Sequence, residues 1–255
     1  MPTPRLPEEL MDSIVDLLRN DRKALKICCL VSKSWIPRAR THLFTDIEIP
    51  TVTRLQSWKT TFSDPNTSPA RYTKFLYVKC PQAVAVADRE EGGWIPTFSR
   101  VECLSIFIPC LRAGEPAISL LPFHGFSPVI KSLSLENYSL PSSQIFNLAY
   151  SFRLLEDLSL FTSTDLSTHE DGGFDEKPIP IQPPLTGSLT LSAQDGAHLI
   201  VSRLLSLPDG LRFRELNLGC NYEEDTLSMT TLVERCCSTL ESLAIGGSDL
   251  GACIW

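Results

Sequence analysis

The chain has 255 residues, of which 43% are apolar and 21% are charged, and its formal net charge is −7. This balance predicts a globular protein with a large core in one or two domains. No stretch approaches the roughly 18 apolar residues of a membrane-spanning helix, and the N-terminus has no apolar run of the kind that a secretory signal needs. We therefore expect an intracellular protein, cytoplasmic, nuclear or both, without a membrane partner.

Charge and cysteine usage narrow the function classes further. Residues 44–255 hold 15 Lys/Arg against 25 Asp/Glu, so this part lacks the basic footprint that nucleic-acid binding needs. The nine cysteines are an odd number with two adjacent pairs, which favours reduced thiols. There is no Cys-x-x-Cys pair and the histidines are scattered, so we expect no metal site and no cofactor.

The first 44 residues predict three short helices. Pro7 suits the first helical position, where its missing N–H costs nothing. Leu10, Ile14 and the pair Leu17 and Leu18 repeat at helical spacing and form one stripe.

A second helix follows a cap at Asn20 and Asp21, and Ser32 or Ser34 starts a third helix with Pro37 in its first turn. The buried side of the second helix is expected to consist of Leu25, Cys28, Leu30 and Val31. A unit this small has a poor ratio of core to surface, so leftover apolar side chains indicate a partner.

This segment resembles an F-box through several motifs in order. They are Leu-Pro-x-Glu-Leu, an Ile/Leu stripe, Lys-Ala-Leu-Lys-x-Cys-x-Leu-Val-Ser-Lys-Ser-Trp and Arg-x-His-Leu-Phe, within roughly residues 4 to 46. The likeness is to the F-box proteins of fungi, of the basidiomycete-like type. It implies docking to the Skp-type adaptor of a cullin-RING ubiquitin ligase. By the same resemblance, the adaptor-binding residues would be Leu6, Pro7, Leu10, Ile14, Leu30, Val31 and Trp35. The alternative is that these side chains form the internal core of a helical cap.

The rest of the chain repeats a short strand motif, in which two apolar residues stand one residue apart. It recurs at steps of 25 to 31 residues, and such alternation is typical of a strand with one buried face. The eight pairs are Ile47/Ile49, Leu76/Val78, Leu104/Ile106, Leu133/Leu135, Leu158/Leu160, Leu189/Leu191, Leu216/Leu218 and Leu243/Ile245.

Helices are expected between several of these strands. The apolar stripes lie at Thr53–Phe62, Ser142–Phe152, Ala197–Leu205 and Thr226–Cys237. A strand and a helix in each repeat of this length resemble degenerate leucine-rich repeats, with a parallel sheet on the concave side. The predicted fold is therefore α/β: an F-box domain over residues 1–46, then a leucine-rich-repeat-like solenoid of about eight units over residues 47–255.

A doubly wound sheet is the alternative. It is disfavoured because the strand motif keeps its own period and no glycine-rich phosphate loop follows a strand.

Three segments depart from the repeat. Residues 161–185 are rich in turn formers and acidic residues, which predicts an exposed loop. Residues 81–100 predict a frayed helix that ends in a glycine turn. No polar capping repeat follows the last motif, so we expect an incomplete or uncapped C-terminal end.

Catalytic motifs are missing from the sequence. Paired carboxylates such as Glu90 and Glu91 lie in polar contexts, where burial cannot shift their pKa, and no basic cluster marks a reactive cysteine. We expect a protein that is not an enzyme. The first hypothesis is the substrate-recruiting adaptor subunit of a Skp-cullin-F-box ubiquitin ligase. The second is a repeat-scaffold interaction protein whose F-box no longer engages a ligase. The target is unknown, and open strand positions such as Ser134, Glu136, Ser159, Asn217 and Ala244 would select it.

Overall fold

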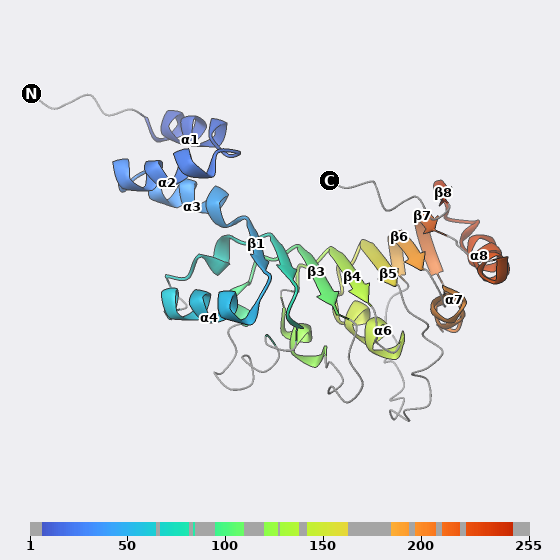
Figure 1. Cartoon of the computed structure of the whole chain (residues 1–255). Coiled ribbons are helices and arrows are strands. Elements are labelled where there is room, and N and C mark those ends of the chain that lie inside the picture. Colours follow the sequence, from blue (N-terminus) through green and yellow to red (C-terminus); the bar gives the residue numbers. More distant parts are fainter. Residues whose placement is uncertain are drawn as a thin grey trace, which may run out of the picture.

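The computed structural model describes residues 7–64, 67–81, 84, 95–109, 120–126, 128–137, 142–162, 185–193, 197–207, 211–219 and 223–246. The fold is α/β, with three N-terminal helices that lead into an open sheet (Figure 1). The helices are α1 (Glu8–Leu17), α2 (Arg22–Val31), α3 (Ile36–Phe44), α4 (Val52–Thr61), α6 (Ser142–Ser151), α7 (Ala197–Leu205) and α8 (Glu223–Cys236). The strands are β1 (Asp46–Ile49), β2 (Phe75–Val78), β3 (Cys103–Ile108), β4 (Ser132–Asn137), β5 (Asp157–Thr162), β6 (Leu185–Ala193), β7 (Leu211–Gly219) and β8 (Ser242–Gly246).

Three N-terminal helices form as the sequence predicts, and α2 begins after the predicted cap. Pro7 is the N-cap of α1 and not its first helical residue, and α3 begins at Ile36, later than Ser32 or Ser34. The Asp21 carboxylate caps α2 by accepting the backbone N–H groups of Lys23 and Ala24, at 2.9 and 3.0 Å. Pro37 lies in the first turn of α3, where a missing N–H is tolerated. The helices enclose a small core of their own, made of Val15, Leu25, Cys28, Ala39 and Leu43.

The eight strands form one sheet in which every pairing is parallel. Their spatial order follows the chain from β1 to β8 without a reversal. A doubly wound sheet has a switch point at which the strand order reverses, so the doubly wound alternative is wrong for the described residues.

The register aligns the predicted apolar pairs in two continuous rows across all eight strands. The first row joins Ile47, Leu76, Leu104, Leu133, Leu158, Leu189, Leu216 and Leu243; the second joins Ile49, Val78, Ile106, Leu135, Leu160, Leu191, Leu218 and Ile245. From β1 to β7 these side chains are buried in one core, which confirms the strand prediction. In β8, Leu243 and Ile245 are exposed.

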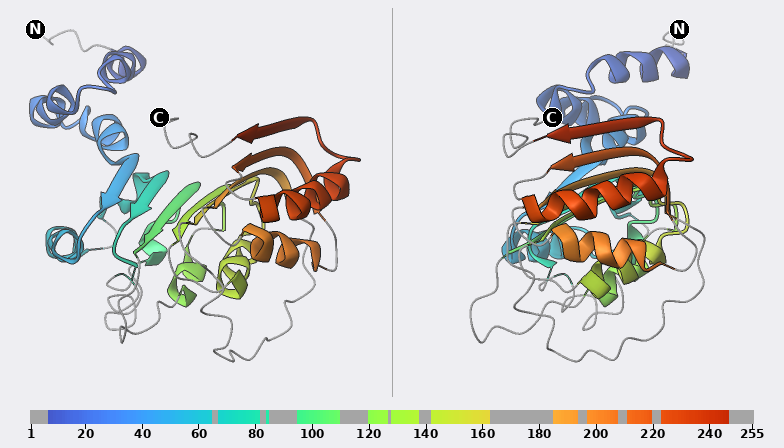
Figure 2. Two further views of the ribbon diagram at one scale, coloured as in Figure 1. Left: turned by 45° about the vertical axis from the view of Figure 1, so that its right-hand side comes forward. Right: turned by 90° about the vertical axis from the view of Figure 1, so that its right-hand side faces the viewer.

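Helices α6, α7 and α8 lie along one face of the sheet (Figure 2). Their buried residues include Ile145, Leu148, Ile200 and Leu232, as the apolar stripes predict. The stripe assigned to Thr226–Cys237 is wrong at two positions, because Leu227 and Cys237 are exposed. Within the described residues, no helix combines the length and apolar character that crossing a membrane requires.

The predicted loop at residues 161–185 is too long at both ends. Phe161 and Thr162 end β5, and Leu185 begins β6, because both ends continue the ladder with their neighbouring strands. The remainder of that loop, most of residues 81–100 and the chain after Gly246 lie outside the described residues, so the expectations for them stay predictions.

An aromatic cluster joins the N-terminal helices to the sheet. Phe44, the last residue of α3, packs against both cores. Its ring meets those of Trp58 and Phe62 edge to face, with centroids 6.0 and 5.9 Å apart, and Trp58 stacks on Phe98 at 6.0 Å. The joint between the N-terminal helices and the sheet therefore centres on Phe44, whereas the His42 ring turns back to Asp16 on α1.

One glycine is required by the sheet. Gly187 has a φ of +83° in β6, at a bulge where the register with β7 shifts between Gly187 and Ser188. A Cβ atom there would lie 1.9 Å from the backbone oxygen of Glu156. That oxygen accepts the backbone N–H of Ser188 at 2.7 Å, so it has no room to move away.

We predict that Gly187→Ala lowers the free energy of unfolding by about 1–3 kcal/mol, because alanine combines backbone strain with a backbone clash. Urea unfolding measures the change. The control is Gly125→Ala, since a Cβ at Gly125 would meet only the Ile95 Cγ2 at 3.8 Å. Equal stability of the two variants would contradict the prediction.

Candidate functional site

Two helices of the N-terminal unit expose aliphatic side chains that its own core does not bury. The exposed fractions range from 40% to 87%. We call these residues the helix patch: Leu10, Ile14 and Leu17 on α1, and Ile27, Leu30 and Val31 on α2. On each helix they follow the i, i+3, i+4 or i+7 spacing of a single face, while Val15, Leu25 and Cys28 on the same helices are buried.

The predicted adaptor-binding residues are distributed unevenly. Leu10, Ile14, Leu30 and Val31 belong to the helix patch, and Pro7 is exposed at the start of α1. The expectation that Leu30 and Val31 lie on the buried side of α2 is therefore wrong. Trp35 is partly buried against the small core, which agrees in part with the alternative of an internal cap. Leu6 lies outside the described residues.

The helix patch also includes two residues that are missing from the predicted set. Leu17 is 86% exposed and Ile27 is 60% exposed. Their spacing was a usable signal, since Leu17 follows Leu10 by two helical turns and Ile27 precedes Leu30 and Val31 by one. The resemblance did not assign them, because it transferred only motif positions.

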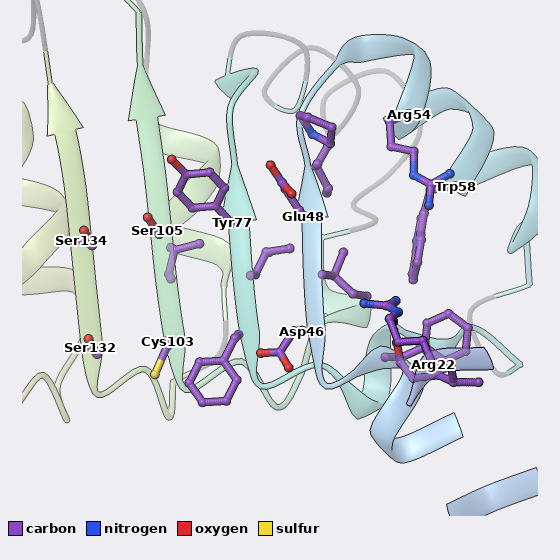
Figure 3. A pocket seen from close by; sticks show the side chains of 18 residues that line it. Arg22, Asp46, Glu48, Arg54, Trp58, Tyr77, Cys103, Ser105, Ser132 and Ser134 are labelled. Atoms are coloured by element: carbon purple, nitrogen blue, oxygen red, sulfur yellow. Dashed lines mark hydrogen bonds between the residues drawn. The ribbon is translucent and has the colours of Figure 1, made fainter. Parts of the chain in front are cut away.

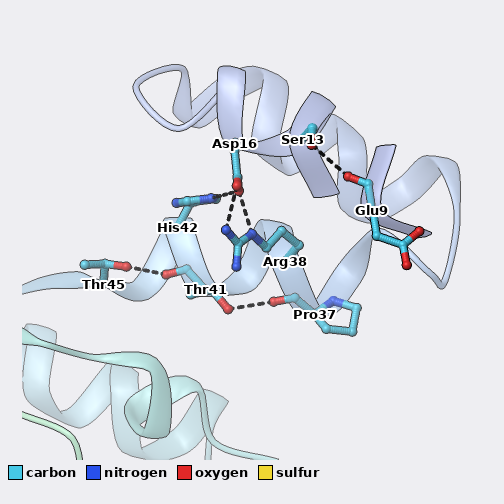
Figure 4. Close-up of polar contacts among 8 residues, drawn as sticks. All are labelled: Glu9, Ser13, Asp16, Pro37, Arg38, Thr41, His42 and Thr45. Carbon is cyan, nitrogen blue, oxygen red and sulfur yellow. Dashed lines mark hydrogen bonds and ion pairs between the residues drawn. The ribbon is translucent and has the colours of Figure 1, made fainter. Parts of the chain in front are cut away.

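A polar contact holds α1 against α3 (Figure 4). The Arg38 guanidinium donates two hydrogen bonds to the Asp16 carboxylate, at 2.5 and 2.6 Å, and the Nε2 atom of His42 lies 2.7 Å from Asp16 Oδ1. The Arg38 hydrogen bonds, followed by the His42 contact, hold the pKa of Asp16 well below its usual range. This carboxylate therefore sets the angle at which α1 presents its apolar stripe.

The second surface is the face of the sheet opposite the helices. Strand residues alternate along it, so each strand turns its polar positions outward. We call this surface the open face. Its first row is Asp46, Phe75, Cys103, Ser132, Asp157, Ser188, Glu215 and Ser242, and its second is Glu48, Tyr77, Ser105, Ser134, Ser159, Thr190, Asn217 and Ala244. A third row, Phe107, Glu136, Phe161 and Ser192, lies nearer the strand ends.

A groove of about 780 Å³ crosses the open face from β1 to β4, where α4 lies beside the edge strand (Figure 3). Asp46, Glu48 and Tyr77 stand along it, and Arg54 and Trp58 line it from α4. Its walls thus offer acidic, basic, hydroxyl and aromatic groups together, with Arg22 and Arg54 as the basic ones, which suits a polar ligand in an extended conformation.

Side chains at the carboxyl ends of β1, β2 and β4 form a connected network. Lys79 Nζ lies 2.9 Å from Glu48 Oε1 and 5.1 Å from the centre of the Tyr77 ring. The Tyr77 hydroxyl donates to Glu136 Oε1 at 3.4 Å. Burial, followed by the negative charge of Glu136, raises the pKa of Tyr77. The hydroxyl therefore stays protonated and keeps donating at neutral pH.

The described residues offer no catalytic arrangement that we recognise. Burial lowers the pKa of His124 and raises the pKa of the Cys80 and Cys103 thiols, so these cysteines are poor nucleophiles. His198 lies beside the buried Asp225, which accepts its backbone N–H and links α8 to α7. No cluster of His, Cys, Asp and Glu among the described residues could hold a metal ion.

Comparison with protein-family models, with curated proteins and with solved structures found no match. The resemblance of the N-terminal segment to an F-box therefore depends on its own motifs and on the surfaces described above.

We predict that Asp16→Asn loosens α1 by about 1 kcal/mol, the upper end for exposed ion pairs. The folded state lowers the pKa of Asp16. The stabilisation is therefore complete above the unfolded-state value of about 4 and is lost as the pH falls toward the folded-state pKa. Hydrogen exchange of the α1 and α3 amides, in the wild type and the variant from neutral pH to pH 3, measures it.

The control is Asp12→Asn, one turn earlier on α1, since Asp12 acts on Arg38 through its charge but is not one of the carboxylates that hydrogen-bond to it. The difference between wild type and Asp16→Asn should shrink as the pH falls. A difference that stays constant across this range would show that the Asp16 charge does not hold α1.

Proposed function

We propose that this chain is the substrate-recruiting adaptor subunit of a Skp-cullin-F-box ubiquitin ligase. Residues 1–46 act as the F-box that binds the Skp-type adaptor. Residues 47–255 act as a leucine-rich-repeat-like solenoid whose open face binds a target protein. Catalysis belongs to the partner enzymes, and the chain contributes proximity, because holding a target near the transferring enzyme raises its effective concentration.

The helix patch is the observation that carries the proposal. Six aliphatic side chains are exposed on two helices of a unit with a core of only five buried residues. Each such side chain stabilises a complex by the order of 1–2 kcal/mol when a partner covers it. A sum of this size supports specific binding even after the entropy cost of association. The resemblance of the ordered motifs to an F-box is the reason for proposing a Skp-type adaptor as the partner.

The open face supports the second half of the proposal. Parallel sheets in compact domains usually have helices on both faces, whereas α6, α7 and α8 all cover the same face here (Figure 2). A single open face is typical of repeat solenoids, which use their concave surface for binding. The aromatic joint at Phe44 fixes this surface relative to the helix patch, so a bound target would have a defined position in the ligase.

We predict that the purified full chain binds a recombinant Skp-type adaptor. The double variant Leu17→Gln and Leu30→Gln should weaken this binding by about tenfold or more, because central apolar contacts dominate such interfaces. Both side chains are more than four-fifths exposed, so the double variant should fold normally. Isothermal titration calorimetry measures the affinities, and circular dichroism verifies the fold.

Leu227→Gln is the matched control, since Leu227 is an exposed leucine on α8, 77% accessible, and lies outside the helix patch. It should bind the adaptor as the wild type does. If the folded wild-type chain fails to bind, the ligase proposal is overturned in favour of a scaffold whose F-box no longer engages a ligase.

A further inference from the structure

The third row of the open face places a carboxylate between two aromatic rings. Phe107 on β3, Glu136 on β4 and Phe161 on β5 are consecutive partners in the register. Their neighbours Ile106, Leu135 and Leu160 are buried, so the alternation turns all three side chains to the open face. At the usual strand spacing, the two phenylalanine Cα atoms are roughly 10 Å apart on either side of β4, so a planar group above Glu136 could reach both rings.

Glu136 has no ion-pair partner among the described residues. Its hydrogen bond comes from the neutral hydroxyl of Tyr77, at 3.4 Å. The Lys79 ammonium is paired with Glu48 at 2.9 Å and is therefore occupied. Glu136 is thus a half-buried carboxylate without a hydrogen-bonded cation among the described residues, although the Lys79 ammonium is close enough to interact with its charge.

The charge of the open face has one dominant sign. The described residues of its three rows include five carboxylates and no lysine or arginine: Asp46, Glu48, Glu136, Asp157 and Glu215. Lys79, which follows β2, pairs with Glu48, and Arg22 and Arg54 line the β1 edge of the groove on this face. Because these carboxylates extend from the strands of a rigid sheet, their negative electrostatic potential is fixed in place. This potential favours a cationic ligand.

We propose that the open face binds a basic, extended segment of a protein, and that one arginine of this segment lies between Phe107 and Phe161 with its guanidinium on Glu136. The planar guanidinium stacks on aromatic rings and pairs with a carboxylate through two parallel hydrogen bonds. The rings supply cation–π attraction to the same group. This inference rests on the proposed function in one respect: the basic segment is taken to belong to a ubiquitination target.

The probe is a fluorescent peptide of alternating glycine and arginine. The distance from β1 to β7 is about 29 Å at the usual strand spacing, and about ten extended residues span roughly 35 Å, so a peptide of that length covers the acidic rows. Fluorescence anisotropy with the full chain at low ionic strength should show saturable binding. Peptides with glutamate or serine in place of arginine should not bind, and lysine should bind more weakly.

Two single variants test the proposed binding position of the arginine. Glu136→Gln keeps the size of the side chain and should raise the Kd about fivefold, because it removes a charge-assisted pair. Phe161→Leu keeps an apolar side chain without an aromatic face and should raise the Kd about threefold. The matched control is Glu234→Gln on α8, an exposed carboxylate outside the three rows, which should leave the Kd unchanged.

A loss of affinity with Glu234→Gln equal to that with Glu136→Gln would overturn the proposal, because it would show diffuse attraction to a negative protein. Equal binding of the glutamate peptide, or no saturable binding of the arginine peptide, would also overturn it. The same preparations are titrated with the Skp-type adaptor. Failure of peptide binding with intact adaptor binding refutes only this inference, and the converse refutes only the ligase proposal.

Discussion

The unshifted pairing of parallel strands is the constraint on which the rest of this structure depends. Each strand from β1 to β7 contributes only a few buried apolar residues, too few for a core of its own. From β1 to β7, stacking at constant register turns these pairs into continuous buried rows against one layer of helices. The bulge at Gly187 absorbs a single register change without breaking the rows. Because the helices occupy one side of the sheet, the same pairing creates the open face.

The period of the sequence was sufficient to predict the eight strands and most helix faces, since burial at an alternate position depends only on local geometry. It failed where burial depends on a neighbouring element. Leu227 continues an apolar stripe yet is exposed, because α8 has a described helix on one side only. Phe161 was assigned to a loop because a turn-rich stretch follows it, although its pairing with Glu136 extends β5. Contacts between distant residues, such as Tyr77 with Glu136, leave no signal in the spacing.

The two surfaces differ in their physical character, and this difference suits two kinds of partner. The helix patch is aliphatic and lies on short helices held by a small core, so burial of apolar area is its source of affinity. The open face is acidic and aromatic on a rigid sheet, where charge and ring stacking give selectivity. The ring contacts of Phe44 connect the two surfaces, so a partner on one surface has a fixed orientation relative to a partner on the other.

The constant register has a consequence for how such a protein can diversify. Every strand places one side chain in each of the first two outward rows, on the side of the sheet away from the buried rows. Exchange of Ser134, Ser159 or Asn217 therefore changes the ligand surface at one defined coordinate with little cost in folding stability. The open face is therefore a grid of positions at which single substitutions change the exposed chemistry while the buried rows and the helix patch stay unchanged.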